Sequence, residues 1–188
     1  MRSIAIIFAV CWVAFWIYWI ISAFGSKRSI VTNTRRFFAI RIVLLVLAIL
    51  LLHIGNGVSQ SSGGHFLGTN KITLAIGIIL FLLGIALAVW ARICLGKNWG
   101  MPMTQKQDPQ VVTTGPYRYI RHPIYTGLLL MALGSALDVN IYWLVVFIVS
   151  CVYFVYSAFA EEKTMGRQFP KVYATYKSKT KMLVPFIF

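Results

Sequence analysis

Long apolar runs alternate with short polar, basic segments along the chain. Apolar runs cover residues 4–24, 37–54, 72–94 and 141–160, and a shorter one covers 124–137. At about 1.5 Å per residue, a helix of roughly 20 residues crosses the hydrocarbon core of a bilayer. The pattern therefore predicts an all-α fold, a polytopic transmembrane helical bundle of about five spans.

The run over 4–24 and the short run over 124–137 differ from the other three. The run over 4–24 is rich in Trp and Tyr, and its positive charges follow it, so we expect a retained helix rather than a signal peptide. The run over 124–137 is marginal for a full crossing. With the turn at 138–140 and the run over 141–160, it predicts a tight helical hairpin that the pair Glu161-Glu162 closes.

Composition narrows the class of protein. Of the 188 residues, 59% are hydrophobic, which excludes an ordinary soluble domain. A net charge of +14 would indicate nucleic acid in a soluble protein. Here the basic residues lie between apolar runs, where they set topology and meet anionic headgroups, so we expect membrane lipids as partners and no nucleic acid. The three cysteines show no metal-ligand spacing, and we expect no metal.

The basic residues also predict an orientation. Of the 18 Lys and Arg residues, all but Arg2 and Lys71 fall on one side of a five-span arrangement, if Arg41 is counted with the nearer loop. By the positive-inside rule, the N-terminus is outside and the C-terminus is cytoplasmic. The same count brings several polar segments to the cytoplasmic face, namely 95–100, 115–127, 161–162 and the basic, aromatic tail.

The segment from Gly115 to Gly127 is polar, aromatic and basic, and it lies between apolar runs. One interpretation is a juxtamembrane anchor, with Arg at the headgroups and Tyr at the interface. The other is a helix end built into a binding pocket. Pro123 favours a helix start, and the free N–H groups of that first turn suit an anion. Arg121 offers a fork of donors, and Gly127 allows a close approach.

Glu161 and Glu162 are half of the four acidic residues in the chain. Two adjacent carboxylates at a helix end can hold ligand hydroxyls or an ammonium group. The alternative is simple ion pairing with a nearby cation, either Lys163, Arg167 or Arg121. The sequence contains no Ser/His/Asp set and no glycine-rich phosphate loop.

These motifs resemble those of a known family. Gly115-Pro116-Tyr117 followed by Arg121-His122-Pro123-Ile124-Tyr125 resembles the hallmark of the isoprenylcysteine carboxyl methyltransferases and their phospholipid methyltransferase relatives. Leu95-Gly96 with Trp99 is similar to the family's upstream element. Glu161-Glu162 with the later residues Phe169, Tyr173 and Tyr176 is similar to its terminal motif. The resemblance covers half of the chain and implies a division into three N-terminal spans, 1–94, and a catalytic half, 95–188.

The resemblance implies an integral membrane methyltransferase that uses S-adenosylmethionine. Its lipophilic or lipid acceptor enters from the bilayer, and its active site faces the cytoplasm, in a bacterial inner membrane or the endoplasmic reticulum. Arg121 and His122 are the candidate catalytic residues, with His122 as a base if the acceptor is an amine or phenol. The positions that match the family's cofactor site are Trp99, Tyr117, His122, Pro123, Tyr125, Gly127, Glu161 and Glu162.

The chain departs from the family pattern at two places, of which the first bears on the acceptor and the second on the local turn. Carboxyl-methylating members carry an Arg about one turn before the Glu pair, where this chain has Tyr156-Ser157-Ala158-Phe159. Pro170 stands where Gly is usual after Phe169.

Two alternatives remain. Membrane sterol reductases, which use NADPH, share Arg-His-Pro-x-Tyr-x-Gly but are much longer and carry Asn at the position of Ile124. The other alternative is a non-catalytic membrane protein of the same fold.

Overall fold

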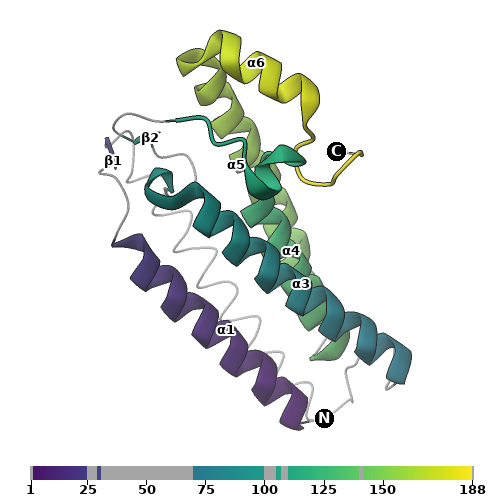
Figure 1. Ribbon diagram of the computed structural model, residues 1–188. Helices are drawn as coiled ribbons and strands as arrows, with labels where there is room; N and C mark the ends of the chain where they lie inside the picture. Colours follow the sequence, from purple (N-terminus) through teal and green to yellow (C-terminus); the bar gives the residue numbers. More distant parts are fainter. Residues whose placement is uncertain are drawn as a thin grey trace.

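The computed structural model describes residues 2–24, 29–30, 70–99, 105–106, 110–139 and 142–187. Helices dominate this part of the chain (Figure 1). They are α1 (Arg2–Ala23), α3 (Lys71–Leu95), α4 (Pro123–Asp138), α5 (Tyr142–Gln168) and α6 (Pro170–Lys179). Two short 3-10 turns, η1 (Gly96–Asn98) and η2 (Gly115–Arg118), precede α4, and the two-residue strands β1 (Ser29–Ile30) and β2 (Gln105–Lys106) pair antiparallel.

Three of the described helices are long and apolar enough to cross a membrane. They cover Ile4–Ser22, Lys71–Asn98 and Tyr142–Gln168. Large apolar side chains along them, such as Val10, Ile93 and Val152, are more than half exposed, as expected for a surface that faces lipid. The chain is therefore an integral membrane protein with a helical fold, as predicted.

The count of five spans stays a prediction. The run over 124–137 forms α4, whose 16 residues are fewer than the three spanning helices have. The predicted second span, 37–54, lies outside the described residues. The orientation of the termini and the boundary between 94 and 95 also stay predictions.

Glycines bring α3 and α4 into backbone contact. A Cβ built on Gly84 of α3 would lie 2.6 Å from the carbonyl oxygen of Gly127, and one built on Gly127 would lie 2.7 Å from that of Gly84. Further along α4, a Cβ built on Gly134 would lie 2.5 Å from the carbonyl oxygen of Gly77 in α3. Small residues at such contacts are typical of helix pairs in membranes, where close packing replaces the hydrophobic effect as the source of association.

Helix α1 packs on this pair mainly through aromatic rings. The ring centroids of Phe8 and Phe81 lie 4.3 Å apart, and both side chains are buried. The indole of Trp12 donates a 3.1 Å hydrogen bond to the hydroxyl of Ser135 in α4. Because Ser135 also donates to the carbonyl oxygen of Met131, this buried polar group is satisfied inside the bundle.

The two prolines that follow polar segments each begin a helix. Pro123 is the first residue of α4, which confirms the predicted helix start at this proline, and His122 is the N-cap. Pro170 begins α6 directly after Phe169. The prediction that the Glu pair closes the hairpin is wrong, because α5 continues to Gln168. The apolar run ends at Ala160, whereas the helix continues to Gln168 and carries the Glu pair on its polar extension.

Candidate functional site

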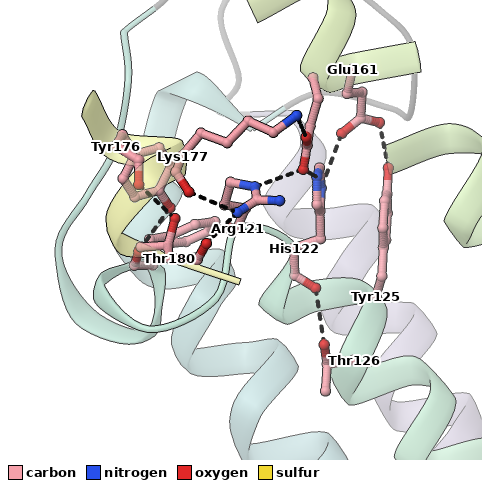
Figure 2. A network of polar contacts seen from close by, with 10 residues as sticks. Arg121, His122, Tyr125, Thr126, Glu161, Tyr176, Lys177 and Thr180 are labelled. Atoms are coloured by element: carbon pink, nitrogen blue, oxygen red, sulfur yellow. Dashed lines mark hydrogen bonds and ion pairs between the residues drawn. The ribbon is translucent and has the colours of Figure 1, made fainter. Parts of the chain in front are cut away.

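Glu162 of α5 joins the end of the bundle to the segment before α4. Its Oε1 lies 2.6 Å from Nε of Arg121, and its Oε2 lies 2.7 Å from Nζ of Lys177 in α6 (Figure 2). The side chains of Arg121 and Glu162 are only 7% and 3% exposed. Of the pairings expected for the Glu pair, the one with Arg121 is therefore confirmed for Glu162.

Glu161 faces a different set of partners. The hydroxyl of Tyr125 donates a hydrogen bond to its Oε1, and Nδ1 of His122 lies 3.6 Å from its Oε2. The other ring nitrogen of His122, Nε2, lies 3.6 Å from Oε1 of Glu162. The imidazole thus lies between the two carboxylates (Figure 2). Consecutive helical residues point about 100° apart, which lets two adjacent glutamates reach different partners.

Aromatic rings form a stack beside the carboxylates. The rings of His122 and Tyr125 are nearly parallel, with centroids 5.3 Å apart. Tyr125 in turn stacks on Phe154 of α5 at 4.6 Å. The first turn of α4 therefore presents an imidazole and a phenol to the polar end of α5.

A C-terminal strap, Thr180–Leu183, runs beside the segment before α4. The backbone N–H groups of Arg121 and His122 donate to the carbonyl oxygens of Lys181 and Met182, at 2.8 and 3.1 Å. The hydroxyl of Thr126 donates to the carbonyl oxygen of Leu183 at 2.7 Å. These bonds fix the register of the strap against the first turn of α4.

Arg121 also holds the strap with its side chain. Its guanidinium donates to the carbonyl oxygens of Thr180 and Lys177, in addition to Glu162. No sequence pattern indicated that Lys177 and Thr180 belong to this network. A carbonyl acceptor leaves no mark on residue type, and Lys177 is one of several basic residues in the tail.

Three tyrosines with shifted pKa values lie at this end of the bundle, and one of them donates a hydrogen bond to η2. The phenol of Tyr176 donates a 2.7 Å hydrogen bond to the carbonyl oxygen of Tyr117, which ties α6 to η2. Burial raises the pKa of Tyr117, Tyr173 and Tyr176 above the ordinary value for a phenol. These hydroxyls therefore keep their protons at neutral pH.

Trp99 and Gly127 have other described partners. Trp99 packs edge-on against Trp19 of α1 at 5.9 Å, and the guanidinium of Arg92 lies 4.8 Å from its ring centroid. Arg92 itself donates to the carbonyl oxygens of Ser22 and Gly96. Gly127 faces α3, where a Cβ would meet Gly84. These contacts do not test a cofactor role for either residue, which stays a prediction.

The turn before the Glu pair has two faces. Ser157 and Ala158 are fully buried, whereas Tyr156 and Phe159 are more than half exposed. The hydroxyl of Ser157 has no hydrogen-bond partner among the described residues. The exposed side of this turn is thus aromatic, and residues 156–159 include no cation.

The chemistry of the cluster limits what it can bind. In the described part of the chain, no group of three or more His, Cys, Asp or Glu residues could hold a metal ion. Nε2 of His122 is buried without a hydrogen-bond partner there. Two carboxylates and a stacked pair of aromatic rings suit a ligand that offers hydroxyls and a positive charge.

Comparisons with known proteins find one matching family and similar proteins. The sequence model of the phospholipid methyltransferase family matches residues 72–172. Protein-S-isoprenylcysteine O-methyltransferase from Saccharomyces cerevisiae is 33% identical over 121 residues, which are 62% of this chain and 51% of the yeast protein. The chain thus spans about half the length of this relative.

A solved structure resembles the fold. The eukaryotic intramembrane Ras methyltransferase ICMT (isoprenylcysteine carboxyl methyltransferase) superposes with a TM-score of 0.56 at 18% identity. The match covers 84% of this chain and 55% of that one. At this level of identity, the likeness shows the fold alone.

Proposed function

Because this chain belongs to the phospholipid methyltransferase family, we propose that it is an integral membrane methyltransferase that transfers the methyl group of S-adenosylmethionine to a lipophilic acceptor. One observation carries the proposal beyond family membership. One network at one end of an apolar bundle joins the Arg121-His122 segment to the Glu161-Glu162 pair. Arg121 and Glu162 are 41 residues apart in the sequence.

The residues of this network fit the cofactor. S-adenosylmethionine supplies a methyl group already activated by its positively charged sulfur. Glu161 and Glu162 would accept hydrogen bonds from its hydroxyls or ammonium group, and the unsatisfied Nε2 of His122 is a further polar contact. The stacked rings of Tyr125 and Phe154 favour a neighbouring cation. Trp99, Tyr117, Pro123 and Gly127 belong to the proposed site on the basis of the family motif.

The protein has little bond chemistry to perform in such a reaction. A carboxylate acceptor is already deprotonated at neutral pH, so it needs no base. The network then acts by alignment and exclusion of water, which is worth about 7–11 kcal/mol of barrier in favourable cases. For an amine or phenol acceptor, His122 is the candidate base, and its imidazole is held between Glu161 and Glu162.

Arg121 has a role that its contacts define. Its guanidinium already donates to Glu162 and to the strap carbonyls of Lys177 and Thr180. Within the proposal, it holds the Glu pair and the strap in place beside His122. An Arg fork is suited to this task because several donors point in fixed directions from one plane.

The acceptor is an isoprenylcysteine-type carboxylate or another lipid or isoprenoid. The yeast relative, whose name specifies isoprenylcysteine, supports the first. The apolar turn at residues 156–159 supports the second, because it offers an acceptor carboxylate no cation. The acceptor enters from the bilayer, and the site faces the cytoplasm. The host membrane is a bacterial inner membrane or the endoplasmic reticulum.

Methyl transfer to lipid tests the proposal directly. Membranes that contain the full chain are incubated with S-adenosylmethionine carrying a radiolabelled methyl group, and lipids are extracted and separated. We expect label in a lipid product, and loss of that label in Glu162→Gln but not in Lys163→Gln, which changes the neighbouring exposed residue. NADPH-dependent reduction without methyl transfer would support the sterol-reductase alternative. The absence of both activities would support a non-catalytic protein.

A further inference from the structure

The last described residues, Val184–Ile187, form a tight turn with apolar side chains on its surface. The N–H of Ile187 donates to the carbonyl oxygen of Val184 at 3.3 Å. Pro185 is the second residue of the turn, and Phe186 is the third, with a φ of 67°. A proline followed by a positive φ is typical of a type II turn, whose third position favours glycine.

Phe186 is therefore unusual in two respects. A bulky side chain at a positive φ is strained, and this side chain is also 86% exposed. Ile187 is 77% exposed beside it. Neither the backbone conformation nor packing within the described protein accounts for a phenylalanine here, whereas burial in a surrounding apolar phase would.

The strap fixes the level of this turn along the bundle. Leu183 accepts a hydrogen bond from Thr126, in the first turn of α4. Met182 and Leu183 are buried against Tyr125 and Ala158. Val184 follows directly, so the turn begins where the apolar helices α4 and α5 reach their polar end. Figure 1 shows this end of the chain beside η2 and the start of α4.

Positive charge directly precedes the turn along the chain. Lys179 at the end of α6 and Lys181 in the strap are exposed, as is Lys177, which pairs with Glu162. The described acidic side chains at this end are Glu161 and Glu162, and both have partners within the network. The charges of Lys179 and Lys181 therefore face outward without described acidic partners.

We propose that the turn Val184–Ile187 docks into an anionic lipid surface at this end of the bundle. Phe186 and Ile187 lie in the boundary between headgroups and acyl chains, and Lys179 and Lys181 meet the lipid phosphates. Apolar side chains flanked by lysines are the combination that binds peripheral segments to anionic membranes. The strap then connects the lipid surface to the segment that carries His122.

Spin-label accessibility tests the depth of the turn. The full chain, with Cys11, Cys94 and Cys151 replaced by Ala, carries one introduced cysteine at Phe186→Cys, Lys179→Cys or Val152→Cys. Each is labelled in nanodiscs of phosphatidylcholine with phosphatidylglycerol. We expect the label at 186 to collide preferentially with oxygen, as at lipid-facing 152, and the label at 179 to collide with a water-soluble nickel complex. A label at 186 that behaves like the one at 179, or that neither reagent reaches, would overturn the proposal.

Two further variants test the chemistry of the docking. Neutralising Lys179 and Lys181 to Gln in the 186-labelled chain should reduce the docked population about fivefold per lysine, from roughly 1 kcal/mol for each lysine near an anionic surface. Phosphatidylcholine alone should give the same loss, and an unchanged population in both would refute the anionic partner. With the label at Ile187→Cys, Phe186→Gly should keep the turn, which favours glycine, yet release the label to water. Retained depth in that variant would show that Phe186 is not the anchor.

Discussion

Arg121 and Glu162 lie 41 residues apart in sequence and form a 2.6 Å ion pair whose side chains are almost fully buried. The pair connects the segment before α4 to the polar end of α5. Because the same guanidinium donates to the carbonyl oxygen of Thr180, it also connects the strap. Three segments that are distant in the sequence thus meet at one side chain.

Removal of this guanidinium should destabilise the protein strongly. Arg121→Ala leaves the buried carboxylate of Glu162 without its closest partner, and breaking such a pair from one side costs about 3–5 kcal/mol. Chemical unfolding in detergent, followed by helical circular dichroism, measures the loss. Arg118→Ala, at an exposed position three residues earlier, should change the free energy of unfolding by less than about 0.5 kcal/mol. Equal losses in the two variants would contradict the structural role of Arg121.

The contact between α3 and α4 predicts opposite effects for two glycine substitutions. In Gly84→Ala the new methyl group would lie 2.6 Å from a backbone oxygen of α4, so we expect a loss of about 1–3 kcal/mol. In Gly166→Ala, in α5, the methyl group meets nothing within 4 Å. That variant should gain up to about 1 kcal/mol from helix propensity. Thermal unfolding of the two in the same detergent compares them, and a stable Gly84→Ala would refute the close contact.

The hydrogen bond from Tyr176 to Tyr117 predicts a smaller effect. Tyr176→Phe removes the donor and leaves the carbonyl oxygen of Tyr117 without it, which should cost about 1–3 kcal/mol. Tyr119→Phe is the matched control, because Tyr119 is more than half exposed. Tyr176→Phe should therefore lower the melting temperature more than Tyr119→Phe does. If Tyr119→Phe were the more destabilised, the bond would not tie α6 to η2 as described.

The buried phenols also predict how stability depends on pH. Burial raises the pKa of Tyr173 and Tyr176 in the folded protein, while an unfolded phenol titrates near about 10. Stability from these groups is therefore fully present below about pH 10 and lost as pH rises above it. Unfolding free energies between neutral and strongly alkaline pH should fall in that window. The fall should be shallower in a Tyr173→Phe, Tyr176→Phe double variant, and an equally steep fall would exclude these phenols as its cause.

Much of the fold could be predicted because the bilayer imposes a long apolar run on each span. The run over 72–94 differs from α3 by one residue at each end, and Pro123 marks the start of α4. The end of α5 could not be read in this way. The hydropathy pattern shows only where the apolar run ends, and the helix continues through Glu161 and Glu162 to Gln168.

The site was predictable in part for a similar reason. The charge distribution placed the segments 115–127 and 161–162 at one end of the bundle, and the contacts of Arg121 and His122 with the Glu pair confirm that they meet. The strap was not predicted. Its contacts run largely through backbone groups, such as the N–H of Arg121 and the carbonyl oxygen of Lys181, which any residue type provides. The partners of Trp99 were also missed, because no periodicity links it to Trp19 of α1.

In the proposed function, the network around His122 and the Glu pair binds the cofactor of a methyltransferase. Calorimetric titration of the purified protein with S-adenosylhomocysteine tests it most directly. We expect binding that weakens in both His122→Ala and Glu161→Gln and is unchanged in Lys163→Gln. Circular dichroism should show that all three variants are folded. Binding of NADPH without S-adenosylhomocysteine, or unchanged affinity in His122→Ala and Glu161→Gln, would contradict it.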